Sequence, residues 1–360
     1  MIKFPALIVS LFIFLCNQAP VKNNNHDNIV DSVLKKQAEI FLAKPGTVGV
    51  SIGLYRNGET YMASFGSTTK TSVQLPDSQT IYGIASITKT FTGLLLANAV
   101  AEGKVKADDD IRKYLDGEYP NLAYNGQPIK LFHLISHVSR LPFFLSDRAE
   151  TPGYTRADFY NDLHHVVIDT LPGVKFKYSN AAAQLLGYIL EKIYGMPYEE
   201  LLHEKITGPL KMKDTYVTLP SAEKKKLAMH YNMDGSYNPQ TYDYMQGAAG
   251  IKTSVADLLK YMVYQTTGND TTIQLSRKES WGFNMGKGKR YSYALGWQIT
   301  TTKEGLHRIS QDGILANCSA VIIFCPELKS GIVVCSNSIS TDAVSALADE
   351  TLHSTVAGMP

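Results

Sequence analysis

The sequence predicts an α+β fold in which strands from both ends of the chain form one sheet, with a helical region inserted between them. Strand-like runs lie at residues 47–66 and again at 290–338, whereas residues 107–265 are dominated by helical segments and long loops. The chain has 360 residues, of which 44% are hydrophobic and 19% charged. This is the composition of a globular protein with enough apolar material for a sizeable core.

Local patterns predict the first elements in order. Apolar residues recur every three to four positions over 27–44, which predicts an amphipathic helix. Residues 47–66 predict a hairpin, because Asn57-Gly58 joins two strand runs and both residues tolerate a positive φ. A strongly apolar helix then follows at 86–105, with Gly103 near its end.

The rest of the chain is predicted to form helices first and then strands. Helical spacing predicts the inserted region, with helices at 129–137, 180–195 and 254–265. After that, apolar strand-like runs lie at 290–302, 316–325 and 331–338. A last helix at about 341–357 closes the chain.

The N-terminus is typical of a secretory signal. Residues 1–19 contain a lysine and an apolar stretch, and a polar run follows, so we expect export to a periplasm or to the exterior. The apolar stretch is too short to span a bilayer comfortably. Cys16 offers a possible lipid anchor, but the bulky residues before it fit that processing poorly. We expect residues 20–46 to form a spacer and helix, and 47–360 to form one domain.

Charge and cysteine content exclude several classes of function. The formal net charge is +2 with no basic stripe, so neither nucleic acid nor an acidic membrane surface is an expected partner. Beyond Cys16, three cysteines remain in apolar runs near the C-terminus: Cys318, Cys325 and Cys335. An odd number without nearby histidines predicts neither a disulfide framework nor a metal site. We therefore expect small core residues, and no metal or cofactor.

One serine stands out as a candidate nucleophile. The spacing Ser-x-x-Lys is common by chance and occurs four times, at Ser32, Ser67, Ser86 and Ser221. Only Ser86 begins a long apolar helix, where free backbone N–H groups and the helix dipole stabilise a developing anion. Lys89 lies on the same face, and apolar surroundings lower the pKa of a lysine, as a proton acceptor requires. The alternative is a capping serine with a lysine that reaches solvent.

A resemblance to a known family supports the chemical interpretation. Residues 82–115 resemble the nucleophile segment of the class C β-lactamase, DD-peptidase and esterase family. Tyr178-Ser179-Asn180 opens a helix and resembles the family's second motif. The resemblance implies that Tyr178 exchanges protons with Lys89, and that Asn180 binds the lysine and the substrate. It covers about residues 47–340 and implies a three-layer α-β-α fold with an antiparallel sheet.

The third motif departs from the family pattern. Gln311-Asp312-Gly313 occupies its place, with glutamine where the family usually has lysine or histidine. The resemblance implies an oxyanion hole formed by the backbone N–H groups of Ser86 and Ile314. Lys329-Ser330-Gly331 matches the motif literally, but we interpret it as a turn between strands. Arg140 stands where the family commonly has glycine.

These observations favour an exported serine hydrolase that forms an acyl-enzyme on Ser86. Without the usual cation, neutral esters or amides, including peptide-like ones, are the expected substrates, and the expected partner is a small molecule or peptide. The alternatives are a true β-lactamase or D-Ala-D-Ala carboxypeptidase, acyl transfer to another acceptor, and a non-catalytic binding or sensor domain. Four tyrosines lie in one stretch that either stacks on substrate or packs structurally: Tyr231, Tyr237, Tyr242 and Tyr244.

Overall fold

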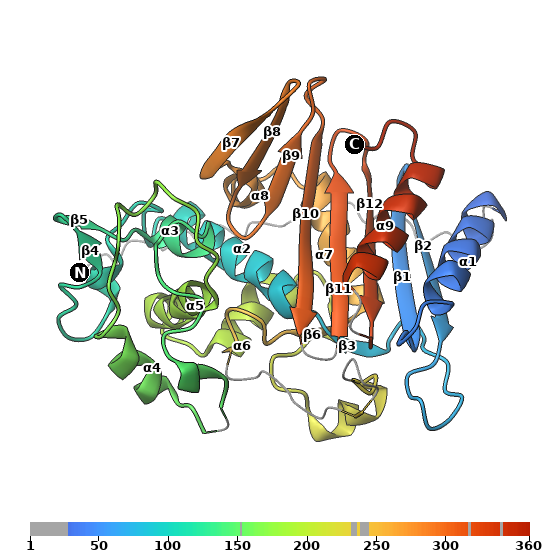
Figure 1. Cartoon of the computed structure of the whole chain (residues 1–360), viewed down its shortest axis with the longest axis horizontal. Coiled ribbons are helices and arrows are strands. Elements are labelled where there is room, and N and C mark those ends of the chain that lie inside the picture. Colours follow the sequence, from blue (N-terminus) through green and yellow to red (C-terminus); the bar gives the residue numbers. More distant parts are fainter. Residues whose placement is uncertain (1–27, 152, 232–235, 238–244, 316–317, 339–340) are drawn as a thin grey trace, which may run out of the picture.

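The computed structural model describes residues 28–360 apart from 152, 232–235, 238–244, 316–317 and 339–340, and these residues form an eight-stranded antiparallel sheet packed between helices (Figure 1). The strand order is β2-β1-β12-β11-β10-β9-β8-β7. The two ends of the chain meet where β1 pairs with β12, with Ile52 opposite Val334. The predicted signal, Cys16, Tyr242 and Tyr244 lie outside the described residues.

The strands of the main sheet are β1 (Gly49–Arg56), β2 (Glu59–Gly66), β7 (Trp281–Gly286), β8 (Lys289–Tyr293), β9 (Gln298–Thr301), β10 (His307–Leu315), β11 (Cys318–Cys325) and β12 (Ser330–Ser336). Two small sheets are formed by β3 (Ile81–Gly83) with β6 (Lys252–Ser254) and by β4 (Ala123–Tyr124) with β5 (Gln127–Pro128). The helices are α1 (Asn28–Leu42), α2 (Thr88–Ala101), α3 (Leu131–Ile135), α4 (Arg156–Leu163), α5 (Asn180–Tyr194), α6 (Tyr198–Leu202), α7 (Val255–Thr267), α8 (Thr271–Arg277) and α9 (Thr341–Thr355).

Alternating side chains of the sheet divide the core into two parts. Along β11, Val321 and Ile323 pack with α1 and α9, whereas Ile322 and Phe324 belong to the larger core with α2 and α7. Successive residues of a strand point to opposite faces, so a fully apolar strand such as β11 must be covered on both sides. This produces the expected three layers, with α1 and α9 on the outer face (Figure 1).

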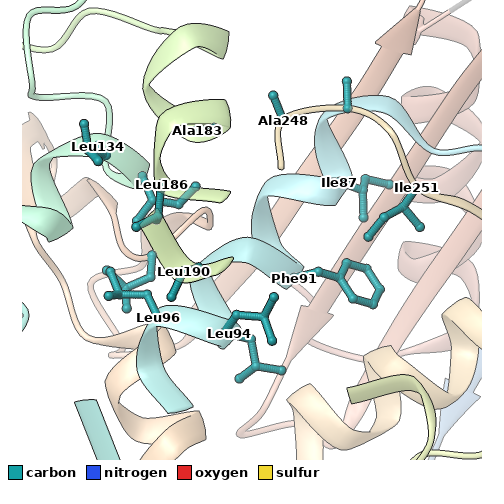
Figure 2. Close-up of a cluster of buried hydrophobic side chains, with 14 of the residues drawn as sticks. Ile87, Phe91, Leu94, Leu96, Leu134, Ala183, Leu186, Leu190, Ala248 and Ile251 are labelled. Carbon is teal, nitrogen blue, oxygen red and sulfur yellow. The ribbon is translucent and has the colours of Figure 1, made fainter. Parts of the chain in front are cut away.

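Helix α2 is the central helix and is buried on nearly every side. Figure 2 shows Leu96 of α2 beside Leu190 of α5, with Phe91 on the opposite side of α2. Phe91 stacks on Tyr261 of α7 with 3.9 Å between the ring centroids. Full burial of each such side chain contributes about 1.5–3 kcal/mol. The helix that follows the candidate nucleophile is therefore held firmly between the sheet and the helical region.

Most predicted elements are present, with one correction. The hairpin turn at Asn57-Gly58 has the expected positive φ angles, 52° and 88°. The run 290–302, predicted as one strand, is instead two strands, β8 and β9, which are joined by a tight turn. Gly296 in this turn has φ 83°, and a Cβ there would lie 2.5 Å from the Lys89 carbonyl oxygen. The turn therefore packs directly on α2, which the strand-like composition did not reveal.

Candidate active site

A strained turn presents Ser86 at the start of α2. Strand β3 leads into a single 3-10 turn, Ala85–Ile87, in which the buried Ala85 has φ 44°. A left-handed conformation is unfavourable for alanine and persists only where its surroundings impose it. Strand β10 lies against this turn, since a Cβ at Gly313 would be 2.1 Å from the carbonyl oxygen of Ile84. Only glycine permits so close an approach of the two backbones.

Lys89 lies one helical turn beyond Ser86 and is fully buried. Its Nζ donates to Ser86 Oγ at 3.0 Å, to Asn180 Oδ1 at 2.7 Å and to the backbone oxygen of Ala248 at 2.9 Å. Ala248 is brought there by the segment before β6, where the N–H of Ile251 donates to Thr88 Oγ1 at 3.1 Å. The ammonium group thus has three acceptors and does not reach solvent, which contradicts the interpretation of a solvent-reaching lysine.

The second motif places two side chains on one side of the backbone. Ser179 is extended, with φ −146° and ψ 118°, so Tyr178 and Asn180 point the same way. Ser179 points away, caps α5 by accepting from the N–H of Ala182, and donates to the carbonyl of Pro142. Tyr178 Oη donates to Ser86 Oγ at 2.8 Å. Ser86 Oγ therefore has both a lysine and a tyrosine within hydrogen-bond distance.

Burial shifts the pKa values of Lys89 and Tyr178 in opposite directions. Burial lowers the pKa of Lys89 to about 7, against an opposing effect of the Asp312 carboxylate. Burial raises the pKa of Tyr178 to about 12; the hydrogen bond with Ser86 opposes this rise and Asp312 adds to it. At neutral pH the tyrosine therefore keeps its proton, whereas the lysine is divided between its two forms. This favours Tyr178 as a proton donor rather than as a phenolate.

The third motif lies on β10, beside the nucleophile. Gln311 is buried, and its Nε2 lies 3.5 Å from the backbone oxygen of Ser86. Gln298 Nε2 donates to Gln311 Oε1 at 2.9 Å and to Asp312 Oδ1 at 3.1 Å. Lys329-Ser330-Gly331, the literal match, lies at the turn between β11 and β12, as expected.

Asn180 lines a cavity of about 310 Å³, and no residue of β10 contributes to the wall of this cavity. Aromatic and apolar side chains form most of its wall: Phe144, Leu145, Ala149, Tyr154, Phe159, Ala181, Tyr188 and Met245. Its polar lining consists of Thr155, Arg156, Asn180, Gln184, Glu191 and Gln246, and Arg156 forms an ion pair with Glu191. A cavity of this mixed character suits an apolar or aromatic group that also carries polar atoms.

Other predicted residues lie outside this cluster. Arg140 has φ 70°, which explains why glycine suits its position, and its guanidinium donates to both carboxylate oxygens of Asp169. Tyr231 is buried against the loop after β2, with its Oη 3.0 Å from Thr69 Oγ1, so it packs structurally. Tyr237 is 54% exposed.

Three groups that contribute to the site were not predicted from the sequence. The carbonyl of Ala248 is a main-chain group without a sequence signal. Gln298 lies in a separate strand from its partners, and its side chain connects Gln311 to Asp312. His137 stacks on Tyr178 with 4.1 Å between centroids, and burial together with Lys89 holds its pKa well below the ordinary value. Within the residues that the structure describes, no group of three or more His, Cys, Asp or Glu side chains could hold a metal ion.

Comparison with known proteins finds a matching family model and related sequences. A family model described as Beta-lactamase matches residues 30–356. The protein flp of Staphylococcus aureus (strain MW2) is 27% identical over 331 residues, which cover 87% of this chain. The chain spans only 64% of the length of flp. The D-alanyl-D-alanine-carboxypeptidase/endopeptidase AmpH of Escherichia coli (strain K12) is 28% identical over 301 residues, which are 78% of this chain and 76% of AmpH.

Solved structures share the fold. The Beta-Lactamase/D-Alanine Carboxypeptidase of Pseudomonas syringae has a TM-score of 0.79 at 20% identity, and the match covers 92% of this chain and 99% of that one. The corresponding Yersinia pestis protein, complexed with citrate, has a TM-score of 0.78 at 23% identity, with 92% and 98% covered. At these identities the structures bear on architecture alone, and they confirm the predicted fold class.

Proposed function

The chain belongs to the beta-lactamase family, and from this premise we propose that it is a serine hydrolase that works through an acyl-enzyme on Ser86. The observation that carries the proposal is the pair of hydrogen bonds at Ser86 Oγ, from Lys89 at 3.0 Å and Tyr178 at 2.8 Å. A non-catalytic binding domain does not need this arrangement around one hydroxyl group.

In the proposed mechanism, neutral Lys89 takes the Ser86 proton as Oγ attacks the acyl carbon. The backbone N–H groups of Ser86 and Ile314 bind the oxyanion. Tyr178 then gives its proton to the leaving group and recovers one from Lys89. Water attacks the acyl-enzyme, releases the acid and returns Ser86 to its starting state. Acyl transfer to an alcohol or amine differs only in the acceptor.

Neutral esters or amides, including peptide-like ones, are the proposed substrates. Gln311 is uncharged at the position where related enzymes carry a cation, and Asp312 adds a negative charge beside it. A hydrogen bond to a charged group contributes about 1.5–3 kcal/mol, whereas one between neutral groups contributes about 1 kcal/mol. Substrates with a carboxylate lose this difference and are also repelled by Asp312. The cavity beside Asn180, whose wall is partly apolar and partly polar, is the proposed site of an acyl group that carries both apolar and polar atoms.

The test is steady-state hydrolysis of a short p-nitrophenyl ester beside nitrocefin, with Ser86→Ala as control. We expect ester turnover that Ser86→Ala abolishes, together with loss of labelling by a fluorophosphonate probe, and negligible nitrocefin turnover. Labelling retained in Ser86→Ala would overturn the assignment of the nucleophile. If neither substrate is turned over, a binding domain or a highly selective peptidase becomes the better account.

A true β-lactamase or D-Ala-D-Ala carboxypeptidase is the second candidate. The name of AmpH, which is 28% identical, favours it. Rapid, saturable nitrocefin turnover, or release of D-alanine from a D-Ala-D-Ala peptide, would support it against the neutral-substrate proposal.

We also propose that the protein is exported, on the basis of the signal-like residues 1–19. None of the helices in the described part of the chain is long and apolar enough to cross a membrane. N-terminal sequencing of the protein recovered from the cell envelope or medium tests this. An intact Met1 in protein confined to the cytosol would overturn it.

A further inference from the structure

We infer that Asp312 selects substrates whose leaving group carries a positive charge, an inference that rests on the proposed function. A neutral substrate only avoids repulsion by the Asp312 carboxylate. A cationic substrate is attracted by this carboxylate, whereas the lysine or histidine that the family usually has at position 311 would repel it.

Sheet geometry places Asp312 on a wall beside the nucleophile. Ser310 pairs with Gln298, and Gln298 with Tyr293, so these three side chains share one face of the sheet. Asp312 is two residues beyond Ser310 and lies on that same face, where Gln298 Nε2 donates to it at 3.1 Å. Tyr291 Oη donates to Gln298 Oε1 at 2.8 Å and completes the wall.

The wall lies on the leaving-group side of the nucleophile. Tyr178, the proposed proton donor to the leaving group, stacks on His137, and the His137 and Tyr293 centroids are 5.9 Å apart. The cavity beside Asn180 has none of these residues in its wall and is left for the acyl group. The Asp312 carboxylate also raises the pKa of Tyr178, so the two groups are within electrostatic reach.

Asp312 forms no ion pair with any of the described side chains, although its charge reaches Lys89, whose pKa it raises. Gln298, its hydrogen-bond partner, is neutral. The nearest cation along the strand, Arg308, pairs instead with Asp349 of α9 at 2.7 Å. Lys89 is turned toward Ser86, and burial has lowered its pKa. A half-buried carboxylate that shares this wall with the Tyr291 side chain, and lies within its electrostatic reach, provides the negative charge that attracts an ammonium ion.

The experiment compares three thioesters by release of a free thiol at pH 8.5. Acetylthiocholine carries a cationic leaving group, 3,3-dimethylbutyl thioacetate is its neutral isostere, and S-acetyl-3-mercaptopropionate is anionic. We expect kcat/KM for the cation to exceed that of the isostere by about fivefold, the upper limit for an exposed ion pair. At this pH Lys89 is mostly neutral, so changes in its protonation contribute little.

Three variants distinguish the outcomes. Asp312→Asn should bring the cation-to-isostere ratio close to one and raise the anion-to-isostere ratio. Asp116→Asn removes the same charge from a side chain that is 95% exposed and should change neither ratio. Ser86→Ala should abolish all turnover. Equal use of cation and isostere by the unmodified enzyme, or a preference that survives in Asp312→Asn, overturns the inference and leaves the proposed function intact. Absence of Ser86-dependent turnover of every thioester and ester overturns both.

Discussion

The protonation of Lys89 is the central question at the scale of single residues. A lysine with its ordinary pKa of 10.5 would be charged at neutral pH and could not accept the Ser86 proton. Burial brings this pKa to about 7, while hydrogen bonds to Asn180 Oδ1 and the Ala248 carbonyl keep the charged form tolerable. Lys89, the proposed base, is therefore partly neutral at physiological pH.

We predict that kcat/KM for a neutral ester rises with pH through about 7, because Lys89 must lose its proton to act. Since the Asp312 carboxylate raises this pKa, Asp312→Asn should shift the rising limb to lower pH. Steady-state rates between pH 5 and 9 measure both effects. A profile that is flat through pH 7, or a shift to higher pH in Asp312→Asn, would contradict the assignment of Lys89 as base.

The same residue predicts a pH dependence of stability. The pKa of Lys89 is about 7 in the folded chain and 10.5 ordinarily, so between these values the unfolded chain binds more protons. The free energy of unfolding should therefore rise with pH between about 7 and 10.5, and Lys89 should contribute no further pH dependence below about 7, where both states carry the proton. In Lys89→Met, which carries no titrating group, urea unfolding at pH 6.5 and 8.5 should lose this part of the slope. An unchanged slope would show that Lys89 is not desolvated.

At the scale of elements, the segment between α3 and α5 determines where Tyr178 lies. It folds back on itself: the N–H of Lys177 donates to the carbonyl of His137, and those of Asn180 and Ala181 donate to Phe143. Arg140 also stabilises this segment, because its guanidinium group contacts Asp169 and the carbonyl of Phe176, two residues before Tyr178. The arginine thus offsets the strain of its own left-handed backbone by contacts that hold the segment.

Substitutions of Arg140 should separate these two effects. Arg140→Gly loses the contacts but relieves the left-handed strain of φ 70°, so we expect a change below about 1 kcal/mol in the free energy of unfolding. Arg140→Ala keeps the strain and loses the ion pair and the hydrogen bond to the Phe176 carbonyl, so we expect about 1–2 kcal/mol of destabilisation. Urea unfolding measures both, with Asp169→Asn as the control for the ion pair alone. Equal effects of alanine and glycine would show that the backbone is not strained there.

At the scale of the whole molecule, the outer layer supports the sheet without reaching the site. Helices α1 and α9 pack on β1, β11 and β12 in a core of their own, and Leu347 of α9 is buried there. The candidate active site belongs to the other core, between α2, α5 and β10. We therefore expect substitutions in the outer core to lower stability without changing catalysis.

Leu347→Ala should lower the free energy of unfolding by about 2–5 kcal/mol, because it leaves a cavity in the outer core. It should leave kcat per folded molecule unchanged. Leu186→Ala in α5, the helix that begins with Asn180, should cost a similar amount and also lower kcat. Chemical denaturation and active-site titration give the two quantities. A loss of kcat in Leu347→Ala that matches the loss in Leu186→Ala would show that the layers are coupled.

The sequence by itself predicted the fold class, the family and most elements, because hydrophobic periodicity and turn residues are local signals. It also selected Ser86, Lys89, Tyr178 and Asn180 as candidates, and the structure brings them together: Lys89 and Tyr178 contact the Ser86 hydroxyl group, and Asn180 contacts Lys89. Their catalytic roles, the oxyanion role of Ile314 and the single domain over 47–360 remain predictions.

Only the tertiary structure decided what surrounds these residues. The desolvation that lowers the pKa of Lys89 comes from segments far apart in the chain, including Asn180 and Ala248, and no local pattern encodes it. The division of 290–302 into two strands follows from packing of the Gly296 turn on α2. The place of Asp312 on one wall with Gln298 depends on strand register. Strand register, the burial of a side chain and the pairing of its charge each depend on many contacts between distant parts of the chain. They are therefore established only when the chain folds.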